Sequence, residues 1–259
     1  MTTIRNKIVD NTILGMGLFR DEIRNSVIFH IPHASNIIPD LNTGFDISKI
    51  ALINQDNIKS TDWNTDEIFD IEGIDSVVYP YSRLYCDVER HIDEFEDNYK
   101  IGRGFFYTKT SDGIIIREED DIFKDYIYRN EYLKHHELLT KKVQTKLDKY
   151  NSALIIDCHS FSFNQLNKDR NTVTPDICIG TDEFHTPDYL LSLVKNTFER
   201  LGFTVEINSP YSGTMVPGLF LNKDNRVKSI MIEINKDLYL NDKEEISYLN
   251  NVIDNMLSF

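Results

Sequence analysis

An α/β fold is the class that the sequence predicts, from three observations. Two apolar runs, at residues 27–31 and 153–156, have the length and composition of buried strands. A long helical pattern at residues 119–150 leads directly into the second run, which is a helix-to-strand step typical of α/β units. The chain of 259 residues contains no internal repeat, low-complexity stretch or linker, so we expect one domain over residues 1–259.

The remaining elements follow the same alternation. Apolar runs predict further strands at residues 76–81, 176–180, 203–208 and 229–234. Helical spacing of apolar side chains predicts helices at residues 46–58, 187–201 and 243–259. The second of these helices is expected to begin at Pro187, with Thr186 as its N-cap. Glycines in residues 99–118 indicate a loop followed by a hairpin.

Composition restricts the class of partner. The chain has 28 Lys and Arg against 42 Asp and Glu, a formal net charge of -14, which argues against nucleic acid or an anionic membrane as a partner. Its three cysteines are few and odd in number, so no disulfide framework is expected. The N-terminus lacks an apolar stretch of signal-peptide length, and no run is long enough to span a bilayer. These features indicate a cytoplasmic enzyme.

Two histidines stand at the ends of the two apolar runs. His33 follows the first run after Pro32, which ends a strand because it has no N–H for the ladder. His159 follows the second run, and strand alternation puts Asp157 and His159 on one face. Because ligands collect beyond the carboxyl ends of strands in open α/β sheets, both histidines are candidates for one site. His30 lies inside its run and is expected to be a packing residue.

Acidic residues complete a candidate metal site. In residues 60–71, Asp62 or Asp66 could turn inward as a ligand, or the acids could simply favour the first turn of a helix capped by Ser60 or Thr61. Glu233 is the single charge in the apolar strand 229–234, where a carboxylate is costly to bury unless it is paired or ligated. Two imidazoles and one carboxylate are the usual ligand set of a catalytic zinc. Glu233 would then act as the general base.

Two arginines and a cysteine offer further chemistry. Arg83 and Arg90 are candidates for binding substrate carboxylates, because guanidinium binds a carboxylate bidentately. Their alternative role is an ordinary salt bridge with Asp87, Glu89 or Asp93. Cys158 is a rival nucleophile beside a histidine, but strand alternation points the two side chains apart. We therefore expect Cys158 to be a core residue.

The sequence also contains six short motifs in this order: HIPHAS, STDW, YSRLYCDVER, DCHSFS, NSPYSG and IMIEIN. In order and spacing they resemble the N-formylglutamate amidohydrolase family, which is related in fold to the zinc carboxypeptidases. The resemblance extends over residues 27–239. It implies a three-layer α/β/α sandwich around a mixed, mainly parallel sheet, one Zn²⁺ per chain, and hydrolysis of N-formyl-L-glutamate to formate and glutamate.

The resemblance further implies roles for single residues. The carboxypeptidase relatives place a Glu three residues after their first His, whereas this chain has Asn36, so the acidic ligand must come from elsewhere. The STDW segment offers Asp62 as the first choice and Asp66 as the alternative. The implied zinc ligands are His33, Asp62 and His159, the implied base is Glu233, and the implied substrate-binding residues are Arg83, Arg90, Tyr211 and Gly213.

Three functions stay open at this point. The first is a zinc amidohydrolase that acts on N-formyl-L-glutamate or another small N-acyl amino acid. The second is a zinc carboxypeptidase or cell-wall peptide amidase with the same site, acting on a short peptide. The third is a metal-free binding protein that kept the fold. Bound metal in protein purified without added zinc would separate the third from the others.

Overall fold

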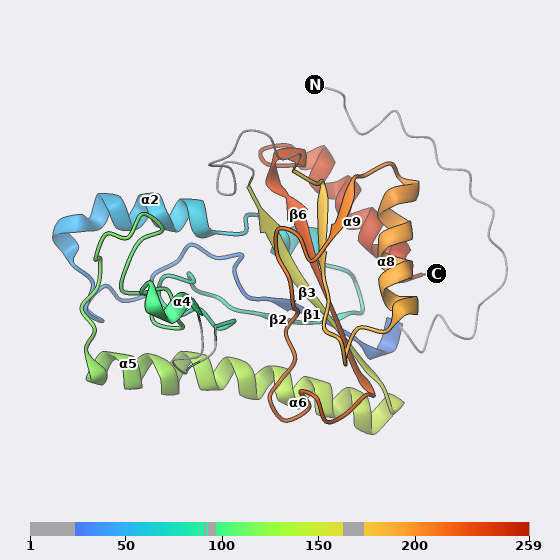
Figure 1. Ribbon diagram of the computed structural model, residues 1–259, viewed down its shortest axis with the longest axis horizontal. Helices are drawn as coiled ribbons and strands as arrows, with labels where there is room; N and C mark the ends of the chain where they lie inside the picture. The colour runs from blue at the N-terminus through green and yellow to red at the C-terminus, as the bar shows by residue number, and fades with distance from the viewer. Residues whose placement is uncertain (1–23, 91, 93–96, 163–173, 259) are drawn as a thin grey trace. The chain divides into compact units, whose positions relative to one another are not determined.

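The protein is described by a computed structural model that covers residues 24–90, 92, 97–162 and 174–258 (Figure 1). Its strands are β1 (Val27–Ile31), β2 (Asp75–Val78), β3 (Ala153–Phe161), β4 (Ile177–Gly180), β5 (Val205–Ile207) and β6 (Val227–Asn235). Its helices are η2 (Ile47–Lys49), α2 (Ile50–Ser60), α3 (Thr65–Ile68), α4 (Asp97–Lys100), α5 (Asp121–Ile127), η3 (Tyr128–Tyr132), α6 (Leu133–Tyr150), α8 (Asp188–Arg200), η4 (Lys236–Leu238) and α9 (Lys243–Met256).

The six strands form one sheet in the order β2-β1-β3-β6-β4-β5. Pairs β1–β3, β3–β6 and β4–β5 are parallel, and β4 runs antiparallel to β6. Every residue of β1 and β3 is buried, which is typical of the central strands of a parallel sheet covered on both faces. This mixed, mainly parallel sheet with flanking helices confirms the predicted α/β fold class.

The chain divides into two compact units. The first unit contains the described residues of Met1–His30, Asn64–Ser76 and Lys142–Phe259, and the second contains those of Ile31–Trp63 and Val77–Lys141. One domain over residues 1–259 stays a prediction. Within the described residues, no helix is both long enough and apolar enough to cross a membrane.

In the first unit, helices pack on the sheet through regularly spaced apolar side chains. Helix α8 contacts β4, β5 and α9, and buries Leu190, Val194 and Phe198 (Figure 1). Helix α9 begins at an N-cap, Asp242, whose carboxylate accepts the N–H groups of two first-turn residues. Helix α8 therefore packs on the β4 and β5 part of the sheet.

The second unit is organised around a buried arginine. The guanidinium of Arg117 lies 4.4 Å from the centre of the Phe45 ring and 3.7 Å from that of Phe106. It donates hydrogen bonds to the carbonyl oxygens of Thr43 at 2.8 Å and Tyr85 at 3.0 Å. Burial lowers the pKa of Arg117 to about 9. The arginine therefore ties the segment before Asp87 to a distant loop of the same unit.

Three local predictions differ from the structure. Strand β3 runs to Phe161 rather than ending at residue 156, because its ladder with β6 continues to that point. In the acidic segment 60–71, Ser60 ends α2 and residues 65–68 form the short helix α3, whose N-cap is Asn64 rather than Ser60 or Thr61. Asp62 lies before α3, and its N–H donates to the carbonyl of His33. Thr186 is not the N-cap of α8, since its hydroxyl donates to the Ser229 carbonyl instead.

Candidate functional site

In the first unit, polar side chains gather on one face of β3 and β6. The Oδ1 atom of Asp157 lies 3.3 Å from Nε2 of His159, which confirms that the two side chains share a face. The same oxygen lies 2.7 Å from Nδ1 of the buried His30. His159 is the register partner of Glu233 on the parallel strand β6, so their side chains also share a face. Both residues are buried.

Asp157 is ionised in this setting. Burial raises its pKa, but the charge of His159 and the hydrogen bonds of His159 and His30 outweigh it, so the pKa lies well below its usual range. Its second oxygen, Oδ2, accepts the backbone N–H of Met215 at 2.8 Å. Asp157 thus connects both histidines to the turn that follows β5.

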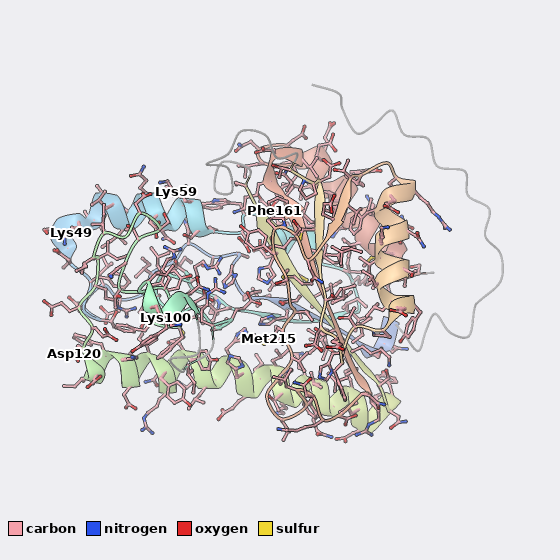
Figure 2. The ribbon with its side chains drawn as sticks, viewed as in Figure 1. Lys49, Lys59, Lys100, Asp120, Phe161 and Met215 are labelled. Carbon is pink, nitrogen blue, oxygen red and sulfur yellow. The ribbon has the colours of Figure 1, made fainter. Side chains whose placement is uncertain are left out.

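That turn carries two of the predicted substrate-binding residues. The ring of Tyr211 lies edge-on to Phe161, with 5.9 Å between the ring centres. Figure 2 labels Phe161, at the end of β3, and Met215, on the same turn as Tyr211 and Gly213. Gly213 has a φ of +85°, which glycine adopts without strain. The turn therefore lies against the sheet face that presents Asp157.

In the second unit, His33 stands just beyond the end of β1, as predicted. Its Nε2 atom lies 2.8 Å from Oδ1 of Asp87, and its Nδ1 atom lies 3.7 Å from Oδ2 of Asp62. All three side chains are buried. The N–H of Asp62 donates to the carbonyl of His33 at 2.9 Å, which fixes the two backbones side by side.

Asp87 connects the histidine to the two predicted arginines. Its Oδ2 atom accepts hydrogen bonds from Arg83 Nε at 3.1 Å and from the Tyr107 hydroxyl at 2.7 Å. Arg90 Nε lies 3.5 Å from the same oxygen. Burial raises the pKa of Asp87, but the charges of Arg83 and Arg90 and the hydrogen bond with His33 outweigh it, so the pKa lies well below its usual range. The carboxylate is ionised.

The pairing of His33 with Asp62 suits a metal ion chemically. An imidazole nitrogen and a carboxylate oxygen are both zinc donors, and two donors about 2.1 Å from one tetrahedral ion lie about 3.4 Å apart. The observed 3.7 Å is too long for a hydrogen bond and within a few tenths of an ångström of that separation. Asp66, the alternative acid, is exposed on α3 in the other unit. The geometry therefore supports Asp62 as the candidate.

The structure places the other predicted residues in two groups. His159, Glu233, Tyr211 and Gly213 belong to the first unit, and His33, Asp62, Arg83 and Arg90 to the second. Cys158 is buried in the core, as expected. The sequence interpretation assigned Asp87 only a salt bridge and gave Glu89 no other role. Their spacing inside the YSRLYCDVER segment, next to the arginines, was the available signal.

These two groups define an α/β protein with buried histidine–carboxylate pairs. The sequence matches the model of the N-formylglutamate amidohydrolase family over residues 25–240. The match covers most of the chain, which belongs to the N-formylglutamate amidohydrolase family. Family membership supports hydrolysis of an amide bond as the activity.

Solved structures show the same fold. The crystal structure of N-formylglutamate amidohydrolase from Ralstonia eutropha JMP134 is similar with a TM-score of 0.76 and 17% identity, over 90% of this chain and 91% of that chain. The structure of gene product Atu2144 from Agrobacterium tumefaciens is similar with a TM-score of 0.59 and 17% identity, over 91% of each chain. A search of curated proteins found no match. Because the sequence identity is 17% in both comparisons, the structural similarity supports the fold alone.

Proposed function

We propose that the protein is a zinc-dependent amidohydrolase that cleaves N-formyl-L-glutamate, or a related N-acyl acidic amino acid, to formate or another acid and the free amino acid. Family membership supports the reaction class. The observation that carries the metal dependence is the arrangement around His33. A buried carboxylate holds one imidazole nitrogen, and a second carboxylate lies 3.7 Å from the other.

The proposed ligands are His33, Asp62 and His159. Zinc in such a site lowers the pKa of a bound water toward neutrality. Asp87 and Asp157 would each orient one ligand histidine through a short contact to its ring.

Glu233 is the proposed general base. It would take a proton from water and deliver it to the amide nitrogen as the carbon–nitrogen bond breaks, so that the amine leaves neutral. Its place opposite His159 in the β3–β6 register supports this role, because base and ligand then lie on one face of the sheet. A buried carboxylate in a strand is otherwise costly.

Substrate carboxylates are assigned to the arginines of the second unit. Arg83 donates twice to Asp87 and is 16% exposed, whereas the side chain of Arg90 is 28% exposed. Arg90 is therefore the stronger candidate for direct contact, with Arg83 supporting it through Asp87. Tyr211 and Gly213, in the first unit, are also proposed to bind substrate.

The test is hydrolysis of N-formyl-L-glutamate beside a panel of N-acyl amino acids and dipeptides, with and without a chelator. Activity that the chelator removes and zinc restores is the expected result. Bound zinc with activity only on peptides would move the assignment to a carboxypeptidase or peptide amidase. No bound metal and no activity on any substrate would contradict the proposal and favour a binding protein.

Two variants separate ligand from base. His159→Ala should lose stoichiometric zinc, whereas Glu233→Gln should keep zinc and lose turnover by at least about 100-fold, the lower range for a general base. Glu206→Gln, which changes an exposed carboxylate on β5, is the matched control. Full zinc occupancy in His159→Ala would contradict the ligand assignment.

A further inference from the structure

A second carboxylate lies beside the same nitrogen of His33. The Oε2 atom of Glu89 is 3.6 Å from Nδ1 of His33, and Oδ2 of Asp62 is 3.7 Å from it. The Glu89 side chain is 14% exposed, so it is mostly removed from solvent. All three residues belong to the second unit. Two carboxylates therefore approach one imidazole nitrogen at nearly the same distance.

These distances fit ligation better than hydrogen bonding. The two heavy atoms of a nitrogen–oxygen hydrogen bond lie about 2.7–3.2 Å apart. The contact between Nε2 of His33 and Oδ1 of Asp87, at 2.8 Å, falls in this range. Two donors of one tetrahedral ion lie about 3.4 Å apart. Arg83 interacts electrostatically with both carboxylates and Arg90 with Glu89, which compensates part of the cost of burying two negative charges together. A divalent cation bound between them would add to this compensation.

The backbone on both sides of Glu89 is held in place. Its own N–H donates to Oδ1 of Asp87 at 3.1 Å. The ring Nε2 of His136, on α6, contacts the Val88 carbonyl at 2.8 Å, and the Tyr132 hydroxyl donates to the Arg90 carbonyl at 2.8 Å. Hydrogen bonds therefore hold the backbone before, at and after Glu89, and this fixes the backbone position from which its side chain extends.

We propose that Glu89 is a further metal ligand, which acts together with His33 and Asp62. This inference rests on the proposed metal dependence. It gives the second unit one nitrogen and two oxygen donors, a hard donor set that suits zinc or manganese and disfavours soft ions such as Cu(I). Glu89 then has a role distinct from Asp87, which orients His33 from the opposite ring nitrogen.

Metal affinity is the direct test. Zn²⁺ and Mn²⁺ dissociation constants are measured by chelator competition for wild type, Glu89→Gln, Asp62→Asn and the control Glu118→Gln, which alters an exposed carboxylate of the same unit. We expect both ligand variants to lose more than about 10-fold in affinity, the lower end of what even an orienting partner contributes. The control should match wild type. Wild-type affinity in Glu89→Gln would overturn the proposal.

A second variant guards against a folding defect. Glu89→His replaces one donor with another, so it should still bind Co²⁺, but with a changed visible absorption spectrum. An unchanged spectrum would show that residue 89 does not touch the ion and would overturn the proposal. Thermal unfolding of the metal-free proteins verifies that each variant is folded.

Binding and turnover are read separately. Glu89-dependent metal binding without hydrolysis of any N-acyl substrate would support the ligand and contradict the proposed reaction. Hydrolysis that needs zinc, with an affinity independent of Glu89, would support the reaction and contradict the ligand. Wild-type protein that binds neither ion would contradict both.

Discussion

Oδ1 of Asp87 lies 2.8 Å from Nε2 of His33, and this contact sets what the imidazole presents to the rest of its unit. Asp87 is buried, and its pKa lies well below its usual range, so it is ionised and can only accept a hydrogen bond. In neutral His33 the proton is therefore assigned to Nε2, and the lone pair belongs to Nδ1. That is the nitrogen beside Asp62 and Glu89.

Asp87→Asn should weaken zinc binding about 10–100-fold, the usual effect of losing a partner that orients a ligand histidine. An amide can donate as well as accept, so it no longer enforces one tautomer. Affinity is measured by chelator competition, with Asp125→Asn, at an exposed ion pair with Arg129, as control. Equal affinity in Asp87→Asn and wild type would show that the contact does not orient a ligand.

Gly180→Ala should destabilise the protein by about 1–3 kcal/mol, the usual cost of overpacking. A Cβ at residue 180 would collide with the carbonyl oxygen of Gly213 and with Met231, so the turn must move away from the sheet. Urea unfolding measures the change. Gly218→Ala is the control, because its Cβ would meet no atom within 4 Å. Similar unfolding midpoints for both variants would refute the close approach.

Asp75→Asn should lower the free energy of unfolding at pH 7 by no more than about 1 kcal/mol, because its carboxylate is 44% exposed. Hydrogen bonds from Lys142, at 2.7 Å, and Lys146, at 2.8 Å, lower its pKa below 3.8 despite burial. As the pH falls, the Asp75 carboxylate takes up a proton in the unfolded chain before it does so in the folded protein. Its contribution to the free energy of unfolding is therefore complete above pH 3.8 and is lost as the pH falls through the lower pKa of the folded state.

Urea unfolding at pH 7, 5, 4 and 3 measures this dependence. The difference between wild type and Asp75→Asn should be constant at the upper values and shrink at the lowest. A difference that grows as the pH falls would contradict the sign of the pKa shift.

Arg90→Lys should raise KM for an acidic N-acyl substrate about 10-fold and leave kcat within a few-fold, because lysine cannot supply the bidentate fork. Steady-state kinetics on N-formyl-L-glutamate measures both constants. Arg226→Lys, at an exposed ion pair with Asp224, is the control. A fall in kcat at constant KM would instead assign Arg90 to the reacting centre.

Much of the fold follows from local sequence. The predicted bounds of β1 match the structure, and the other strands are recovered within a few residues, because continuous apolar runs must be buried. The helical pattern at residues 119–150 is confirmed, although the structure divides it into α5, the π-helical η3 and α6. Its side-chain spacing changes little at these junctions, so a periodic pattern does not reveal them.

The sequence predicted the candidate site less completely than it predicted the fold. His33 and His159 are predicted from their positions at strand ends, Asp62 from the acidic segment 60–71, and Glu233 from being the single charge in an apolar strand. Their ligand and base roles stay predictions. Asp87 and Glu89 looked like ordinary partners for arginines. Their contacts with His33 span more than fifty residues of chain, and no local pattern encodes such a distance.

By itself the sequence determined the α/β class, the family and the chemical types available, because buried strands and short motifs are properties of neighbouring residues. Tertiary structure alone decided which of these residues meet. The β3–β6 ladder places His159 opposite Glu233, and the path from β1 to the segment after β2 brings His33 to Asp87. Register and loop path depend on packing of the whole unit, so they arise only when the chain has folded.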